Sequence, residues 1–116
     1  MLVKDEDRSQ PVVRENFRGG EGKVYISYFV NEERSSPGAL RIMKIVIPPG
    51  SSIGYHQHVG EEEVYFILKG RGEVNDNGNI LEVKPGDMVL TRSGFYHGIK
   101  CIGEEPLELF AMVSKV

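Results

Sequence analysis

The sequence has little cysteine and no excess of basic residues, and both shortages exclude classes of protein. Its single cysteine, Cys101, cannot form a disulfide within the chain, which fits a reducing compartment better than a secretory route. The 14 Lys and Arg are outnumbered by 17 Asp and Glu, so the chain lacks the positive surplus with which proteins bind phosphate backbones. We therefore expect a cytoplasmic protein with no nucleic-acid partner.

Long apolar stretches are also missing. No run approaches the roughly 20 apolar residues that a membrane-spanning helix needs, and the opening MLVKDEDRSQ lacks the apolar centre of a signal peptide. We expect no membrane association. A chain of 116 residues, 40% of them apolar, can bury the core of one domain. We expect a single domain over residues 1–116, with a polar arm over 1–22 and a barrel over 23–116.

What the sequence does contain is a series of short runs rich in Val, Ile, Tyr and Phe, which is typical of strands. The runs cover residues 23–30, 39–47, 63–69, 80–83, 87–91 and 107–113. Between them lie turn sequences at residues 35–38, 48–50 and 84–87, and the pair Asn77-Gly78, which favours a two-residue hairpin turn. No long window without Gly or Pro has a helical apolar stripe. The pattern predicts an all-β, antiparallel sandwich or barrel.

Two of the three histidines lie one residue apart. Successive side chains of a strand point to opposite faces, so His56 and His58 should point the same way. Glu63 follows a turn signal and should face the same point from the neighbouring strand, and His97 can close the site from a strand distant in sequence. Three imidazoles and one carboxylate suit a divalent Mn, Fe, Co, Ni or Zn ion. Four protein ligands leave one or two coordination positions for water, substrate or oxygen.

On these residues the sequence resembles the cupin superfamily. The first cupin motif is filled at every fixed position by Gly50, His56, His58, Glu63 and Gly70. The second motif keeps Gly86, Gly94 and His97, but Arg92 replaces its proline and Cys101 its asparagine. The resemblance implies an antiparallel jelly-roll barrel, also called a double-stranded β-helix, in which the metal ligands are His56, His58, Glu63 and His97.

The resemblance is greatest to small single-domain bacterial cupins described as oxalate-decarboxylase-like, and it implies an organic acid bound to Mn or another divalent metal. Our leading hypothesis is a metal-dependent lyase or oxidoreductase that decarboxylates or oxygenates a small carboxylate or other oxygenated metabolite. One alternative is a non-catalytic cupin that binds a metal or small ligand. Another is a zinc-dependent cupin similar to sugar-phosphate isomerases, although Arg41, Lys44 and Arg92 are few groups for gripping a phosphate.

Strand alternation identifies further candidates. Counting from Glu63 places Tyr65 on the inner face, where it is either a hydrogen-bond donor near the metal or a core aromatic residue. Arg41 belongs to an alternating set that is otherwise apolar, and it is either a grip for a substrate carboxylate or a surface arginine. We interpret Cys101 as a buried apolar filler, and Glu61 and Glu62 as solvated side chains.

The run at residues 63–69 is apolar on both faces. Val64 and Phe66 lie opposite Tyr65 and Ile67, which is more apolar surface than one core uses. We therefore expect the outer face of this sheet to pack on a second copy of the chain in a homodimer.

Overall fold

The fold consists of strands and turns. A computed structural model describes residues 1–31 and 40–116, so the turn predicted at residues 35–38 lies outside the described residues. Within the described residues the helices are limited to two short 3-10 turns, η1 (Asp5–Asp7) and η2 (Phe17–Gly19). None of the helices in this described part is long and apolar enough to cross a membrane. The all-β prediction is confirmed.

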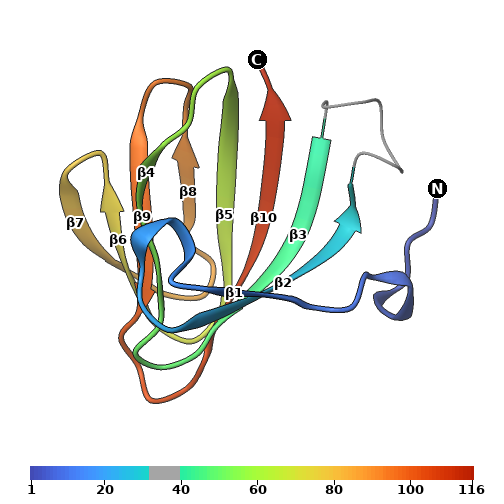
Figure 1. Ribbon diagram of the computed structural model, residues 1–116, viewed down its shortest axis with the longest axis horizontal. Helices are drawn as coiled ribbons and strands as arrows, with labels where there is room; N and C mark the ends of the chain where they lie inside the picture. Colours follow the sequence, from blue (N-terminus) through green and yellow to red (C-terminus); the bar gives the residue numbers. More distant parts are fainter. Residues whose placement is uncertain (32–39) are drawn as a thin grey trace.

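Two antiparallel sheets face each other and enclose the core (Figure 1). The six-stranded sheet has the order β1-β2-β3-β10-β5-β8, and the four-stranded sheet has the order β4-β9-β6-β7. The strands of the larger sheet are β1 (Val12–Glu15), β2 (Lys23–Val30), β3 (Leu40–Ile47), β5 (Glu61–Lys69), β8 (Met88–Thr91) and β10 (Leu107–Lys115). Those of the smaller sheet are β4 (Ser52–Gln57), β6 (Gly72–Asp76), β7 (Asn79–Val83) and β9 (Tyr96–Cys101).

The core is built from alternate residues of these strands. Along β10 the side chains of Leu107, Leu109, Ala111 and Val113 are buried, and the residues between them are more exposed. This period of two is what a strand with one covered face requires. Cys101 is buried in the same core, as predicted.

The predicted hairpin at Asn77-Gly78 is confirmed. Asp76 pairs with Asn79 across a two-residue turn that joins β6 to β7. Asn77 and Gly78 both have positive φ angles, 49° and 99°, as a type I′ turn needs. The hairpin fixes the register of β6, which in turn pairs with β9.

The relation between β4 and β5 differs from the prediction. We expected Glu63 to lie on a strand paired with the strand of His56, but β4 and β5 belong to different sheets. The turn through Gly60, whose φ is 77°, carries the chain from one sheet to the other instead of reversing it within one sheet. Glu63 therefore faces the histidines across the interior of the barrel.

The N-terminal arm contributes a strand of its own. Residues Val12–Glu15 form β1, which pairs with β2 at the edge of the six-stranded sheet. Figure 1 shows β1 passing across the front of the barrel before the following turn, η2, reaches β4. The sequence predicts only a polar arm here, because a strand of four residues with only two valines gives a weak apolar pattern.

Candidate metal centre

Four side chains converge inside the barrel. His56, His58, Glu63 and His97 each offer one ligand atom, and these atoms all lie within 4.8 Å of one another. The Nε2 atom of His58 is 3.2 Å from that of His56 and 3.0 Å from that of His97. Oε1 of Glu63 lies 3.0 Å from Nε2 of His58 and 3.1 Å from Nε2 of His97. The predicted residues are therefore brought together around one point.

Strand pairing explains this convergence. His56 on β4 is paired directly with His97 on β9, so both imidazoles stand on the inner face of the four-stranded sheet. His58 follows the end of β4 and keeps the same direction two residues further on. Glu63 enters from β5 in the opposite sheet, where it is paired with Thr91 of β8.

The outer nitrogens of the imidazoles have partners that orient the rings. Nδ1 of His56 lies 2.7 Å from the backbone carbonyl of Gly54, and because a carbonyl only accepts, this nitrogen carries the proton. Nδ1 of His58 lies 3.3 Å from a carboxylate oxygen of Glu61. In the neutral rings the Nε2 lone pairs of both histidines therefore point at the shared centre. Lone pairs aimed at one point repel each other unless a cation lies between them, so the donor set fits a divalent metal.

The third imidazole is held by a residue that the sequence analysis did not single out. Nδ1 of His97 lies 2.8 Å from the hydroxyl oxygen of Thr91, and both side chains are almost fully buried. This contact could have been predicted from strand alternation along β8. Alternation places Thr91 on the same buried face as Val89, which is the face towards the histidines.

The ionisation of the site favours a negative carboxylate. Burial raises the pKa of Glu63, but in the metal-free protein hydrogen bonds donated by Nε2–H groups of His58 and His97 outweigh it and bring the pKa to about 2. The hydrogen bond to Glu63 raises the pKa of His58, whereas burial lowers the pKa of His56. At neutral pH the centre therefore contains an anionic oxygen beside imidazole nitrogens, the ligand types that bind first-row metals.

Tyr65 lies on the inner face, as predicted, and packs directly on the metal-site cluster. Its ring stacks on His97 with centroids 4.7 Å apart and an angle of 13° between the planes. Its hydroxyl oxygen is 3.4 Å from Nε2 of His97. Burial, followed by the nearby charge of Glu63, raises the pKa of Tyr65 well above its ordinary value, so the phenol keeps its proton. A catalytic role for Tyr65 stays a prediction.

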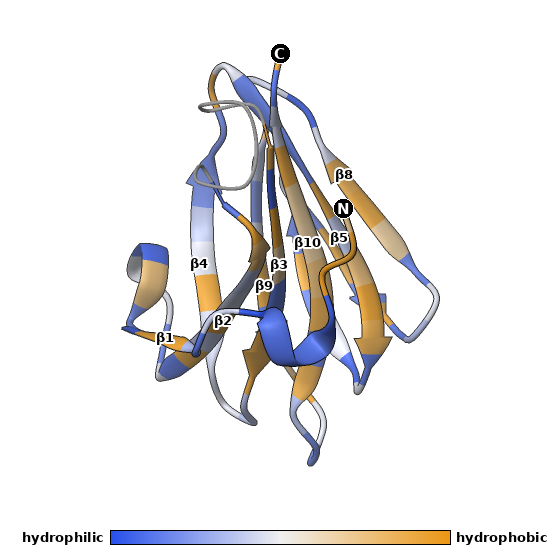
Figure 2. Ribbon diagram, turned by 90° about the vertical axis from the view of Figure 1, so that its right-hand side faces the viewer, coloured by the Kyte–Doolittle hydropathy of each residue, from blue (hydrophilic) through white to orange (hydrophobic). Residues whose placement is uncertain are grey.

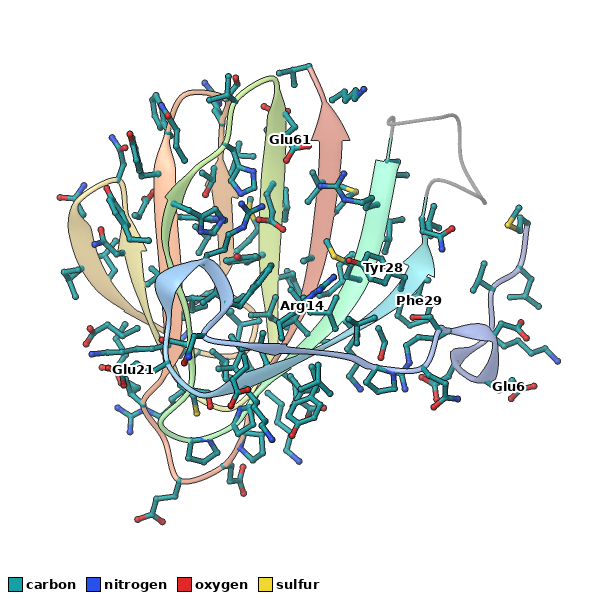
Figure 3. The ribbon with its side chains drawn as sticks, in the orientation of Figure 1. Glu6, Arg14, Glu21, Tyr28, Phe29 and Glu61 are labelled. Carbon is teal, nitrogen blue, oxygen red and sulfur yellow. The ribbon has the colours of Figure 1, made fainter. Side chains whose placement is uncertain are left out.

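Arg41 and Glu61 form a second layer beside His58. Arg41 lies 3.5 Å from Oε2 of Glu61, whose other oxygen faces Nδ1 of His58. Figure 3 shows Glu61 at the start of β5. The interpretation of Glu61 as a solvated side chain is therefore wrong, because the turn before β5 brings it back against His58. Arg41 lines the cavity with Met43 and Ile45, as the alternation predicted, and its role as a substrate grip stays a prediction.

A cavity of about 280 Å³ opens beside the cluster. Its lining includes three of the convergent residues, His56, His58 and Glu63, together with apolar side chains of β2 and β3. Arg14 and Arg18 of the N-terminal arm also line it, and neither was predicted as a site residue. The volume is near the lower end of the range for small-molecule sites, so the cavity suits a small ligand in reach of the metal-site cluster.

Comparisons with known proteins agree with this geometry. The family model described as "Cupin domain" matches residues 43–113, which include all four convergent residues. The oxalate-binding protein of Thermotoga maritima is 40% identical over 84% of this chain and 81% of its own length. A crystal structure from the same organism, described as a predicted oxalate decarboxylase, superposes with a TM-score of 0.92 at 36% identity and covers 100% of both chains.

A more distant relative is named for a different activity. The glucose-6-phosphate isomerase of Thermococcus litoralis is 27% identical over 93% of this chain, which spans 61% of that enzyme's length. The family match nevertheless covers more than half of the chain, and the fold and the histidine and glutamate cluster agree with it. This chain belongs to the cupin family.

Proposed function

We propose that this protein binds a divalent first-row metal through His56, His58, Glu63 and His97, and binds a small carboxylate in the cavity beside it. The observation that carries the proposal is the convergence of three Nε2 atoms and a carboxylate on one point at the wall of that cavity. Mn, Fe and Zn are the ions we favour among those that accept mixed nitrogen and oxygen ligands. Once bound, the metal supplies a positive centre for a carboxylate oxygen.

The rest of the cavity also suits a small organic acid. Arg14, Arg18 and Arg41 give the lining positive charge, while Met43 and Ile45 provide an apolar wall. The names given to the Thermotoga maritima protein and to the crystal structure from that organism both refer to oxalate, which supports a carboxylate as the ligand class. The isomerase alternative has less support, because no lysine is among the described residues that line the cavity.

Two roles follow from carboxylate binding. As an enzyme, the protein would decarboxylate or oxygenate its ligand, and Tyr65 would be the nearest protonated group. As a binding protein, it would hold the ligand unchanged.

The test begins with metal-free protein loaded in turn with Mn(II), Fe(II), Co(II), Ni(II) or Zn(II). Elemental analysis gives the stoichiometry, and calorimetry measures oxalate and acetate binding to the loaded and metal-free forms. We expect one metal per chain and carboxylate binding that depends on it. Equal binding by the metal-free protein would contradict the proposal. CO₂ release and O₂ uptake, followed in the same samples, separate the enzyme from the binding protein.

The outer face of the six-stranded sheet supports the expected homodimer. Phe66 and Leu68 on β5 and Met88 and Leu90 on β8 are exposed by 38% or more. Figure 2 shows apolar segments along β5, β8 and β10, which are neighbouring strands. An exposed apolar face of this kind can pack on its own copy about a twofold axis. We propose a second copy of the chain as the partner.

A further inference from the structure

The N-terminal arm forms one wall of the cavity beside the metal-site cluster. Arg14 on β1, and Phe17 and Arg18 in η2, line the same space as His56 and Glu63. The register explains the direction of Arg14: it is paired with Val24, which is fully buried, and paired residues share a face of the sheet. Figure 3 shows Arg14 on the strand that passes in front of the barrel.

Close backbone contact fixes the segment that carries Arg18. A Cβ atom at Gly54 would lie 2.2 Å from the carbonyl oxygen of Arg18, and one at Gly20 would lie 2.3 Å from the carbonyl oxygen of Ser52. The absence of a side chain at both glycines lets η2 lie directly on β4. Arg18 itself has a left-handed backbone, with φ 56°. The arm is thus attached to the strand that carries His56.

The two arm arginines differ from Arg41 in their charge environment. Arg41 faces the carboxylate of Glu61. Among residues 1–31 and 40–116, no carboxylate lies within ion-pair distance of Arg14 or Arg18. The guanidinium carbon of Arg18 lies over the ring of Phe17, 5.6 Å from the ring centroid. Guanidinium groups bind carboxylates through two parallel hydrogen bonds. The mouth of the cavity therefore carries two such groups whose positive charge is not neutralised within the described part of the chain.

We propose that Arg14 and Arg18 form a second anion subsite, and that the ligand of this protein is a small dicarboxylate. One carboxylate lies at the metal-site cluster, and the other is held at the cavity mouth by the two arm arginines. The proposal rests on the proposed function, because the first carboxylate needs the metal. It adds a recognition element for the second carboxylate on the N-terminal arm, with Arg14 on the edge strand β1 and Arg18 in η2.

Matched ligands and matched variants test the subsite. Manganese-loaded protein is titrated by calorimetry with the dicarboxylates oxalate, malonate and succinate, and with the monocarboxylates acetate and propionate. The variants are Arg14→Gln, Arg18→Gln and Arg18→Lys, and the control is Arg71→Gln. Arg71 is an exposed residue paired with Glu82 and does not line this cavity. Circular dichroism and metal content establish that each variant is folded and loaded.

We expect the wild-type protein to prefer at least one dicarboxylate over the monocarboxylates. Arg14→Gln and Arg18→Gln should each weaken dicarboxylate binding by about tenfold and weaken monocarboxylate binding much less, because a monocarboxylate loses only the general positive charge of the lining. Arg18→Lys keeps the positive charge but not the planar guanidinium, so its dicarboxylate affinity should lie between those of Arg18→Gln and the wild type. Arg71→Gln should bind dicarboxylates as tightly as the wild type.

The outcomes separate this subsite from the proposed function. Metal-dependent binding of both ligand classes with no change in the two glutamine variants would overturn the subsite and leave the proposed function standing. Equal loss for monocarboxylates and dicarboxylates would also overturn it, because the arginines would then act on the first carboxylate. Failure of every carboxylate to bind the metal-loaded wild type, or preference for glucose 6-phosphate over all of them, would overturn both proposals.

Discussion

Glu61 lies beside His58, with its Oε1 atom 3.3 Å from the Nδ1 atom of the imidazole. The carboxylate also faces Arg41 at 3.5 Å, so it connects a cavity-lining arginine to a residue of the metal-site cluster. A carboxylate in this position fixes the proton on Nδ1 and leaves Nε2 as the ligand atom. Glu61 is therefore a positioning residue for the centre.

This contact gives a prediction about metal affinity. Glu61→Ala removes the acceptor of the His58 Nδ1 proton and should weaken metal binding by about tenfold or more. Glu61→Gln keeps an acceptor oxygen but loses the charge, and its effect should be smaller. Competition with a chromophoric chelator measures both. Glu62→Ala is the control, because Glu62 makes none of the hydrogen bonds or ion pairs that the four convergent residues form within the described part of the chain. A loss in this variant as large as in Glu61→Ala would contradict the role of Glu61.

The Nε2 atom of His58 contacts those of both other histidines and the carboxylate of Glu63, as the Nε2 atom of His97 also does. His58→Ala removes one of four ligands, so metal affinity should fall by more than about 100-fold, beyond the usual effect of an outer partner. Elemental analysis after dialysis should find little metal in the variant. A metal content equal to that of the wild type would refute the assignment of the centre.

Much of the site could be predicted because its residues obey local rules. The alternation of a strand places His56 and His58 on one side, and the same rule from Glu63 places Tyr65 inside. These inferences need only the chain within a few residues. Asn77-Gly78 likewise determines its own hairpin through backbone conformations that few other pairs adopt.

The contacts that the sequence did not reveal depend on how distant strands are arranged. Glu63 was expected on a strand beside β4, but it lies across the barrel in the other sheet. The prediction failed because the number of turn residues does not determine whether a chain reverses within one sheet or crosses to another. Arg14 and Arg18 reach the cavity only because β1 pairs with β2 and because Gly20 meets β4. Nothing local in the first twenty-two residues indicates these long-range contacts.

Glu63 gives the metal-free protein a specific acid sensitivity. Its pKa is about 2 in the folded protein against an ordinary value of 4.5, so its ionised form stabilises the fold. This stabilisation is complete above about pH 4.5 and is lost as the pH falls towards 2, with a magnitude of at most about 3 kcal/mol. Urea unfolding at several pH values should show a shallower acid dependence for Glu63→Gln than for the wild type. Equal slopes would show that the carboxylate is not stabilised in the fold.

The apolar outer face predicts a change in oligomeric state. Phe66 is 41% exposed and is paired with Phe110 on one side and Met88 on the other, so it lies in the middle of this face. Phe66→Glu would place a charge in the proposed dimer interface and should convert the dimer to a monomer by light scattering. Glu73→Gln, on the smaller sheet, is the control. A wild-type protein that is already monomeric at working concentration would refute the dimer.

Gly54 links the arm to the site, and a single methyl group there tests that link. A Cβ at Gly54 would lie 2.2 Å from the Arg18 carbonyl oxygen and 2.6 Å from the Gly20 nitrogen, and backbone atoms cannot move aside as a side chain does. Gly54→Ala should therefore displace η2 and lower the free energy of unfolding by about 1 to 3 kcal/mol. Trypsin should cut the displaced arm faster after Arg14 and Arg18.

Gly103→Ala is a matched control, because the nearest atom to its new methyl group is 3.7 Å away. Since the four convergent side chains belong to the barrel and not to the arm, metal binding should persist in Gly54→Ala while dicarboxylate preference declines. A variant as resistant to trypsin as the wild type would show that the arm does not depend on this contact.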